Sequence, residues 1–272
     1  MKVAVASGKG GTGKTTVAVN LAAFNSIDLA DLDVEEPNDY LFLKPMNIKI
    51  KAVSVKVPKV DLEKCNFCGL CSKICQFGAI LVLKDSVNIF DKLCHSCGAC
   101  IYLCPNKAMN EVDREIGKIV EVKTDDINLT YGILNVGEHI PVPLIKRVKE
   151  VAIKKSKNVI FDCPPGTACP MIESILDTDF VILVAEPTPF SLHDLKLAIE
   201  SVNKLKIPYG VIINKYGLPY KALEEFCKQK NIEIIGKIPY DDKIAKYYSN
   251  GLLLAFLKDI FLEIWDKVRE YA

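Results

Sequence analysis

The chain has 272 residues, half of them hydrophobic and a quarter charged, with a formal net charge of +1. This length and composition are typical of a globular protein with room for one large domain and one small one. The near-neutral charge disfavours nucleic acid or an anionic membrane as a partner, and no apolar run is long enough for a transmembrane helix. Met1 leads directly into an apolar segment without the features of a secretory leader, so we expect a cytoplasmic protein with reduced thiols.

A glycine-rich loop follows the first apolar segment. Residues 2–6 predict a short buried strand, residues 8–15 match GxxxxGK[ST], and an apolar helix is predicted over 17–24. A chance glycine-rich turn would lack these flanks, so the pattern indicates a P-loop, which binds phosphate through backbone N–H groups and a helix N-terminus. In a P-loop, Lys14 reaches the β- and γ-phosphates and the Thr15 hydroxyl coordinates Mg²⁺. The expected nucleotide contacts are Gly8, Gly10, Gly11, Thr12, Gly13, Lys14, Thr15 and Thr16.

Lys9 is a second lysine inside this loop, and cradling one nucleotide does not require it. The stretch over residues 9–16 resembles the deviant Walker A motif, KGGxGKTT, of the MinD/Mrp/nitrogenase-iron-protein class of ATPases. In that class the early lysine crosses a dimer interface to the partner's nucleotide. The resemblance therefore implies that Lys9 acts in trans during ATP hydrolysis, and that the protein forms an ATP-sandwich homodimer.

The next strand is predicted over 27–31, and Asp33 lies just after it. In the resembled class this is the place of the switch I aspartate. The resemblance implies that Asp33 orients or activates the water that attacks ATP. Taken alone, an aspartate here could simply cap the turn after the strand.

Eight of the eleven cysteines form two copies of CxxCxxCxxxC, and a shift of 29 residues maps the first copy onto the second. This self-similarity indicates duplication of one cluster-binding unit. Bacterial ferredoxins hold [4Fe–4S] clusters with this spacing, and the fourth cysteine of each run ligates the other cluster. The predicted ligand sets are Cys65, Cys68, Cys71 and Cys104 for cluster one, and Cys94, Cys97, Cys100 and Cys75 for cluster two.

Two other uses of these cysteines are less consistent with the pattern. Disulfides are disfavoured in a reducing compartment. Zinc sites usually consist of two separated CxxC pairs, whereas each run here places four cysteines within eleven positions.

One departure from the ferredoxin pattern is that Gln76 follows Cys75, where Pro105 follows Cys104. Proline shapes the turn after the ligand, so the cluster nearest Cys75 is expected to differ in stability or potential.

The cysteine runs interrupt the nucleotide-binding pattern. Pro45, residues 56–59 and turn residues at 113–117 mark the margins of the interruption. The layout resembles the branch of MinD-superfamily ATPases with an inserted ferredoxin domain. Because the insert follows Asp33 closely, we hypothesise that a movement of switch I reaches the clusters. The expected domains are an inserted ferredoxin-like α+β domain over 60–115 and a discontinuous P-loop ATPase domain over 1–59 and 116–272.

In the second half of the chain, apolar strand candidates alternate with helical ones. This alternation predicts an α/β fold with a doubly wound, mostly parallel sheet, whose ligands bind at the carboxyl ends of the strands. The predicted strands are 158–162, 180–185, 209–213 and 232–236. The predicted helices lie near 142–155, 191–204, 219–230 and 252–270.

Four positions of this half match the resembled class. Residues 162–166 read DCPPG and resemble switch II, which implies that Asp162 holds Mg²⁺ through water, together with Thr15, and that Gly166 senses the γ-phosphate. Asn214 ends the strand predicted over 209–213 and matches the adenine-reading asparagine of the class. Pro239 matches a turn that flanks the base.

Three features outside these motifs have competing interpretations. Cys163 and Cys169 flank switch II as exposed-looking accessory thiols, which could bind a transient cluster or metal, or could simply pack as small apolar residues. Cys227 is expected in the core. The amphipathic stretch over 252–270 could bind a membrane, but its polar face mixes acidic and basic residues, so core packing is favoured.

These observations favour an ATP-hydrolysing iron–sulfur protein in which nucleotide-dependent dimerisation gates electron transfer from two [4Fe–4S] clusters to a redox partner protein. The expected cofactors are ATP, Mg²⁺ and the two clusters; the choice of ATP rests on the family resemblance. One alternative is an ATP-dependent carrier that delivers assembled clusters to apo iron–sulfur acceptors. The other is a regulatory ATPase whose clusters sense redox state.

Overall fold

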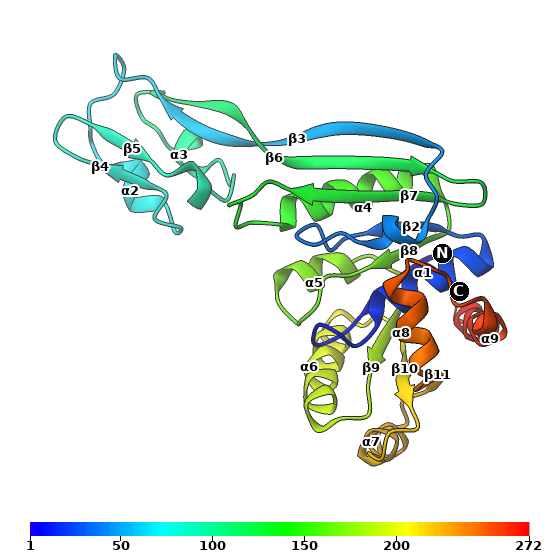
Figure 1. Ribbon diagram of the computed structural model, residues 1–272. Coiled ribbons are helices and arrows are strands. Elements are labelled where there is room, and N and C mark those ends of the chain that lie inside the picture. The colour runs from blue at the N-terminus through cyan, green and yellow to red at the C-terminus, as the bar shows by residue number, and fades with distance from the viewer. Residues whose placement is uncertain (272) are drawn as a thin grey trace.

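A computed structural model describes residues 1–271. Within them, nine strands form one sheet in the order β11-β10-β9-β1-β8-β2-β7-β6-β3 (Figure 1). Neighbouring strands from β11 to β7 run parallel, whereas β7 with β6 and β6 with β3 are antiparallel. The strands are β1 (Lys2–Ala6), β2 (Asp28–Asp31), β3 (Asn47–Val60), β6 (Met109–Lys123), β7 (Asn128–Leu134), β8 (Val159–Asp162), β9 (Phe180–Ala185), β10 (Tyr209–Tyr216) and β11 (Ile234–Pro239).

Helices cover both faces of this sheet, as expected for a parallel sheet whose central strands are apolar on both sides. Strands β8 and β9 are buried along their whole length. One face packs against α4 (Val142–Lys155), α5 (Cys169–Ile175), α6 (Pro189–Leu205) and α7 (Ala222–Gln229). The other packs against α1 (Lys14–Asn25), α8 (Asp242–Ser249) and α9 (Lys258–Arg269). The predicted doubly wound, mostly parallel α/β fold is therefore confirmed.

Most predicted elements of the second half lie within a few residues of the observed ones. The strand over 180–185 and the helix over 142–155 have the observed bounds of β9 and α4. The helix expected over 252–270 is shorter, because a 3-10 turn, η3 (Ala255–Leu257), precedes α9. Its apolar face lies in the core, where Phe261 and Ile264 are buried. Among the described residues, no helix is both long and apolar enough to cross a bilayer.

Strands β3 and β6 form a two-stranded ribbon that extends past the rest of the sheet (Figure 1). β6 pairs with β7 only from Gly117 onward, opposite Leu134, so residues 109–116 project beyond the carboxyl end of β7. The turn expected over 113–117 is wrong, because these residues continue β6. A bulge opposite Val53 and Ser54 places Ile116 in the core with 1% of its surface exposed.

The cysteine runs lie at the far end of this ribbon, in residues 61–108 (Figure 1). The small elements there share a short length and few buried residues: α2 (Leu70–Ile74), β4 (Ile80–Val82), β5 (Val87–Ile89), η2 (Asp91–Leu93) and α3 (Ala99–Tyr102). β4 and β5 pair antiparallel as a separate sheet. β7 is parallel to β2 and β8. The ribbon therefore places this cysteine-bearing unit beyond the carboxyl ends of the parallel strands.

Candidate functional site

The loop between β1 and α1 has a backbone shape that suits phosphate. α1 begins at Lys14, and Gly11 and Gly13 have φ values of 77° and 92°, which glycine adopts without steric cost. Residues in this conformation form concave arrays of N–H groups, and here the array adjoins the positive end of a helix. The loop therefore fits the phosphates of a nucleotide.

Two glycines of the loop also allow close packing. A Cβ on Gly8 would lie 2.3 Å from the carbonyl oxygen of Asp194, and a Cβ on Gly13 would lie 2.2 Å from Asn214 Nδ2. Asn214 Nδ2 donates a hydrogen bond of 2.8 Å to the carbonyl oxygen of Thr12. Side chains and backbone from α6 and β10 thus brace the loop in one position.

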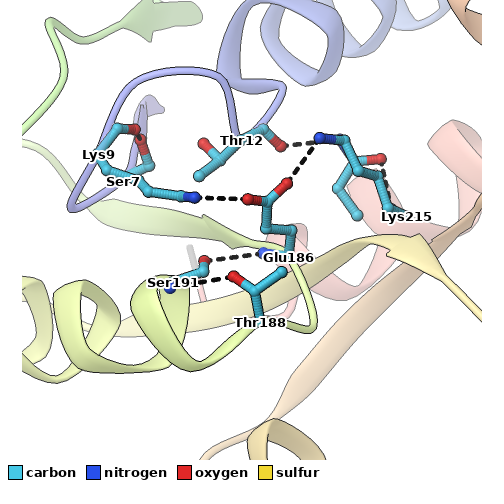
Figure 2. Close-up of polar contacts among 8 residues, drawn as sticks. Ser7, Lys9, Thr12, Glu186, Thr188, Ser191 and Lys215 are labelled. Carbon is cyan, nitrogen blue, oxygen red and sulfur yellow. Dashed lines mark hydrogen bonds and ion pairs between the residues drawn. The ribbon is translucent and has the colours of Figure 1, made fainter. Parts of the chain in front are cut away.

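Lys9 is bound within its own subunit. Its Nζ donates to Glu186 Oε1 at 2.5 Å, and Lys215 Nζ donates to Oε2 at 2.6 Å (Figure 2). The backbone N–H of Glu186 donates to Ser191 Oγ at 3.0 Å, which fixes the start of the turn after β9. Burial alone would raise the pKa of Glu186, but the hydrogen bonds from Lys215 and Lys9 outweigh it and lower the pKa. Glu186 is therefore a carboxylate held between two lysines.

The side chains of Thr15 and Asp162 are in contact next to the P-loop. Thr15 Oγ1 donates to Asp162 Oδ2 at 2.6 Å, and Asp162 is the last residue of β8. Burial raises the pKa of Asp162 to about 6, against the lowering effects of Lys14 and of the Thr15 hydrogen bond. A hydroxyl beside a carboxylate offers the oxygen ligands that Mg²⁺ prefers. These two residues fit a nucleotide-bound magnesium ion.

Asp33 and Gly166 lie on loops next to this pair. The backbone N–H of Asp33 donates to Asp31 Oδ1 at 3.0 Å. Burial raises the pKa of Asp33 to about 6, although the Lys14 charge opposes the rise. Gly166, with φ of 97°, donates its N–H to the carbonyl oxygen of Ser7 at 3.1 Å. The segments expected to be switch I and switch II therefore both approach the P-loop.

Asn214 and Pro239, the two residues expected to face the base, lie on neighbouring strands. Asn214 belongs to β10, and Pro239 ends β11 opposite Tyr216. Asn214 Oδ1 accepts the N–H of Lys215 at 2.9 Å, so both ends of its amide contact the backbone of the protein. Adenine recognition by this residue remains a prediction.

The eight cysteines of the two runs line two cavities. The first is lined by Cys65, Cys68, Cys71 and Cys104, and the second by Cys75, Cys94, Cys97 and Cys100. The fourth cysteine of each run thus lies with the first three of the other, which is the grouping that the ferredoxin pattern implies. Four thiol sulfurs around one cavity are the donor set of a [4Fe–4S] cluster, so the residues present fit that group.

The two cysteine runs have matching local geometry. The backbone N–H of Ala79 donates to Cys75 Sγ at 3.3 Å, and that of Ala108 donates to Cys104 Sγ at 3.2 Å. Positive φ values recur at the same shift in the pairs Phe67 and Ser96, Gly69 and Gly98, and Gly78 and Lys107. N–H groups that point at ligand sulfurs stabilise the negative charge of an iron–sulfur cluster. In the second cavity, His95 stacks on Phe77 with ring centroids 3.7 Å apart.

Of the two interpretations of Cys163, packing as a small apolar residue is confirmed, and the exposed accessory thiol is wrong. Its side chain is fully buried, its Sγ faces the carbonyl oxygen of Phe161, and burial raises its pKa well above the usual thiol range. The physical reason is that the chain continues its sheet pairing past β8, because the N–H of Cys163 donates to the Val5 carbonyl at 3.0 Å. Cys169, the first residue of α5, is exposed, and Cys227 is buried as expected.

Four residues at this site were not predicted for the roles in which the structure places them. Glu186 binds Lys9 through one carboxylate oxygen and Lys215 through the other, and Asp31 and Asp39 lie buried next to Asp162. One signal was available for Glu186, because it directly follows the strand predicted over 180–185, at the edge where ligands of parallel sheets bind. Asp39 offered no such signal, since only the folded loop brings it next to Asp162.

Comparison with known proteins agrees with this geometry. Residues 3–254 match the CobQ/CobB/MinD/ParA nucleotide-binding domain, and the chain belongs to this family. The cell division ATPase MinD of Pyrococcus furiosus aligns over 100% of this chain and 99% of its own, with a TM-score of 0.59 and 18% identity. MinD of Pyrococcus horikoshii with Mg-ADP aligns over 98% of this chain and 95% of its own, with a TM-score of 0.60 and 17% identity.

Two relatives come from Methanocaldococcus jannaschii. An uncharacterized protein is 34% identical over 92% of this chain and 90% of its own length. An iron-sulfur cluster carrier protein is 25% identical over 94% of this chain and 78% of its own. The protein is therefore a P-loop nucleotide-binding protein with relatives that are named as cluster carriers.

Proposed function

We propose that this protein is an ATPase that carries iron–sulfur clusters on its ribbon and delivers them to an apo acceptor protein. The observation that carries the proposal is the presence of two four-cysteine cavities on a MinD-like nucleotide-binding fold, in a chain similar to a cluster carrier protein. Cys68 and Cys97 are exposed, so one ligand of each set is open to an acceptor.

ATP would be bound and hydrolysed by residues of the P-loop and of the neighbouring strand ends. The loop N–H groups and Lys14 bind the phosphates, and Thr15 and Asp162 hold the magnesium ion. Asp33 orients the attacking water from the loop after β2. Lys9 leaves Glu186 and reaches the nucleotide of a second copy of the chain, where its charge stabilises the transition state. Hydrolysis then removes the group that holds the two copies together.

Two contacts and one electrostatic effect support a physical link between the P-loop end of the sheet and the second cavity. The N–H of Leu134, at the end of β7, donates to the carbonyl oxygen of Val34, which follows Asp33. Four residues further on, Glu138 forms an ion pair with Arg114 on the ribbon. The positive charge of Arg114 acts to lower the pKa of Cys94, although burial dominates and raises it. A movement of switch I therefore has a short route to cluster two.

Electron transfer is the second candidate function. It is favoured by the complete set of four cysteines around each cavity, because a carrier must release its cargo, whereas four thiolates retain a cluster. In this case ATP-dependent dimerisation would gate electron flow from the clusters to a redox partner, and the clusters would not leave the chain.

One experiment separates the two functions. The protein is reconstituted anaerobically and reduced with dithionite, its iron is counted, and electron paramagnetic resonance is followed while ATP is added with either an apo-ferredoxin or an oxidised holo-ferredoxin. Iron that moves to the acceptor in an ATP-dependent way supports the carrier. Iron that stays while the clusters change redox state supports electron transfer. Lys14→Gln serves as the control that should bind little nucleotide, and transfer at an equal rate in this variant would contradict nucleotide control.

A further inference from the structure

Three buried carboxylates meet beside the P-loop. Asp31 ends β2, Asp39 begins η1 (Asp39–Phe42), and Asp162 ends β8. One oxygen of each lies within 4.8 Å of the others. The exposed fractions are 1% for Asp31, 0% for Asp39 and 2% for Asp162. The cluster is therefore shielded from bulk water, and its charges must be balanced from within the protein.

Only Asp31 is well supplied with hydrogen bonds. Its carboxylate accepts the backbone N–H groups of Asp33 at 3.0 Å, Asn38 at 2.9 Å and Asp39 at 3.3 Å. Neither oxygen of Asp39 accepts a hydrogen bond from any donor in residues 1–271, and Asp162 Oδ1 also lacks one. Three buried carboxylate oxygens, two on Asp39 and one on Asp162, thus have no donor.

This arrangement is unfavourable for three bare carboxylates. An ionised carboxylate that leaves water costs several kcal/mol unless it is paired, and like charges at this separation add to the cost. Burial, and then the neighbouring carboxylates, raise the pKa of both Asp31 and Asp39. Buried carboxylates of this kind either share protons or ligate a metal ion.

We propose that Asp31, Asp39 and Asp162 bind a divalent cation directly, and that they do so before any nucleotide is present. The site shares Asp162 with the magnesium site described above, but its other ligands are Asp31 and Asp39, where that site uses Thr15 and the phosphates. A Mg²⁺ ion usually binds one or two carboxylates plus phosphates and water. Three converging carboxylates from the protein alone suit a hard cation with oxygen ligands, such as Mn²⁺.

The cation would also fix the loop over residues 31–39. Its two ends, which already meet through the hydrogen bonds to Asp31, would also be joined through the metal, and Asp162 would connect them to β8. Asp33 lies within this loop, so its carboxylate would be positioned before ATP arrives. The cation site does not depend on the clusters, and it would affect Asp33 only through the shape of the loop.

The test is a titration of Mn²⁺ into the anaerobically reconstituted protein without nucleotide. Free Mn²⁺ is counted by electron paramagnetic resonance. We expect about one bound ion per chain, and at least a tenfold weaker affinity in Asp39→Asn. The control is Glu35→Gln, which removes an exposed carboxylate from the same loop and should bind Mn²⁺ like the wild type. No uptake by the wild type, or equal affinity in Asp39→Asn, would overturn the proposal and favour shared protons.

A second measurement guards against a folding defect. In the presence of a chelator, Asp39→Asn should unfold at a higher temperature than the wild type, because it removes a buried charge. Saturating Mn²⁺ should stabilise the wild type and leave the variant nearly unchanged. Binding of a fluorescent ATP analogue is measured in parallel. If both proteins bind the analogue but neither binds Mn²⁺ alone, the cation site fails while the ATPase proposal stands.

Discussion

Lys9 Nζ lies 2.5 Å from Glu186 Oε1 in the same subunit, although 177 residues separate the two. Lys215 occupies the other carboxylate oxygen at 2.6 Å. If Lys9 serves the nucleotide of a partner subunit, it must first leave this ion pair. In that case Glu186 would restrain the lysine in the single chain, and the strength of the pair would be part of the free energy of dimerisation.

The first prediction is that Glu186→Gln strengthens ATP-dependent dimerisation. A partly exposed ion pair is worth about 1 kcal/mol, and two are lost per dimer, so the dimer should form about 25-fold more tightly. Sedimentation with a slowly hydrolysed ATP analogue measures the change. Glu200→Gln, an exposed site on α6, is the matched control. An unchanged dimer constant in Glu186→Gln would show that the pair does not restrain Lys9.

The second prediction concerns the glycines of the P-loop. Gly8→Ala would place its Cβ 2.3 Å from the backbone oxygen of Asp194, whereas Gly10→Ala meets nothing within 4 Å. Overpacking against backbone costs about 1–3 kcal/mol. Gly8→Ala should lower the free energy of unfolding by that amount in urea, and Gly10→Ala should change it by less than about 0.5 kcal/mol. Equal destabilisation by both variants would contradict the close packing at Gly8.

The third prediction is a pH dependence at Asp33, whose pKa is raised from 3.8 to about 6 by burial. Above pH 6 the folded protein holds an ionised, poorly solvated carboxylate that the unfolded chain solvates freely. The stabilising effect of the raised pKa is therefore full below pH 3.8 and lost as the pH rises through 6.

Asp33→Asn removes this cost. The variant should be more stable than the wild type by about 1–2 kcal/mol at pH 7 without nucleotide, and the two proteins should converge near pH 4. Urea unfolding at each pH measures the difference. The control is Asp125→Asn, an exposed aspartate between β6 and β7. If the difference in unfolding free energy between Asp33→Asn and the wild type is the same at every pH, the pKa of Asp33 is not raised.

The sequence identified the features whose signals are local. The P-loop was visible because strand, glycine turn and helix are consecutive, and the apolar run over 180–185 had no other interpretation than a buried strand. β3 was not predicted, although NIKIKAVSVKV alternates apolar and polar residues, because Pro45 and residues 56–59 are also typical of a domain margin. The ion pair of Lys9 with Glu186 and the position of Asp39 depend on loops that meet only in the folded chain, so no local pattern could give them.

The fourth prediction separates the cluster cysteines from the thiols near switch II. Cys104→Ser should lower the iron content from about eight to about four per chain, with the loss confined to the first cavity. Cys169→Ser should retain about eight, because Cys163, the other thiol of the switch II segment, is buried. Iron analysis after anaerobic reconstitution checks both. Loss of iron in Cys169→Ser would instead support the hypothesis that Cys169 binds a cluster or metal.

The fifth prediction tests the link between the ATPase fold and the second cavity. Glu138 is 3% exposed and Arg114 14%, so Glu138→Gln leaves a largely buried guanidinium without its carboxylate, at a cost of about 3 kcal/mol. Asp113→Asn breaks an exposed pair with Lys56 on the same ribbon and should cost less than about 1 kcal/mol. Urea unfolding compares the two variants directly.

The same two variants distinguish a route to the cluster from simple stability. Because the charge of Arg114 acts on Cys94 of the second cavity, Glu138→Gln should release the iron held there to a chelator several-fold faster, while the first cavity keeps its rate. In the wild type, ADP and an ATP analogue should give different release rates from the second cavity, and Glu138→Gln should reduce that difference. If the nucleotide effect is equal in Glu138→Gln and Asp113→Asn, switch I reaches the cluster by another path, or not at all.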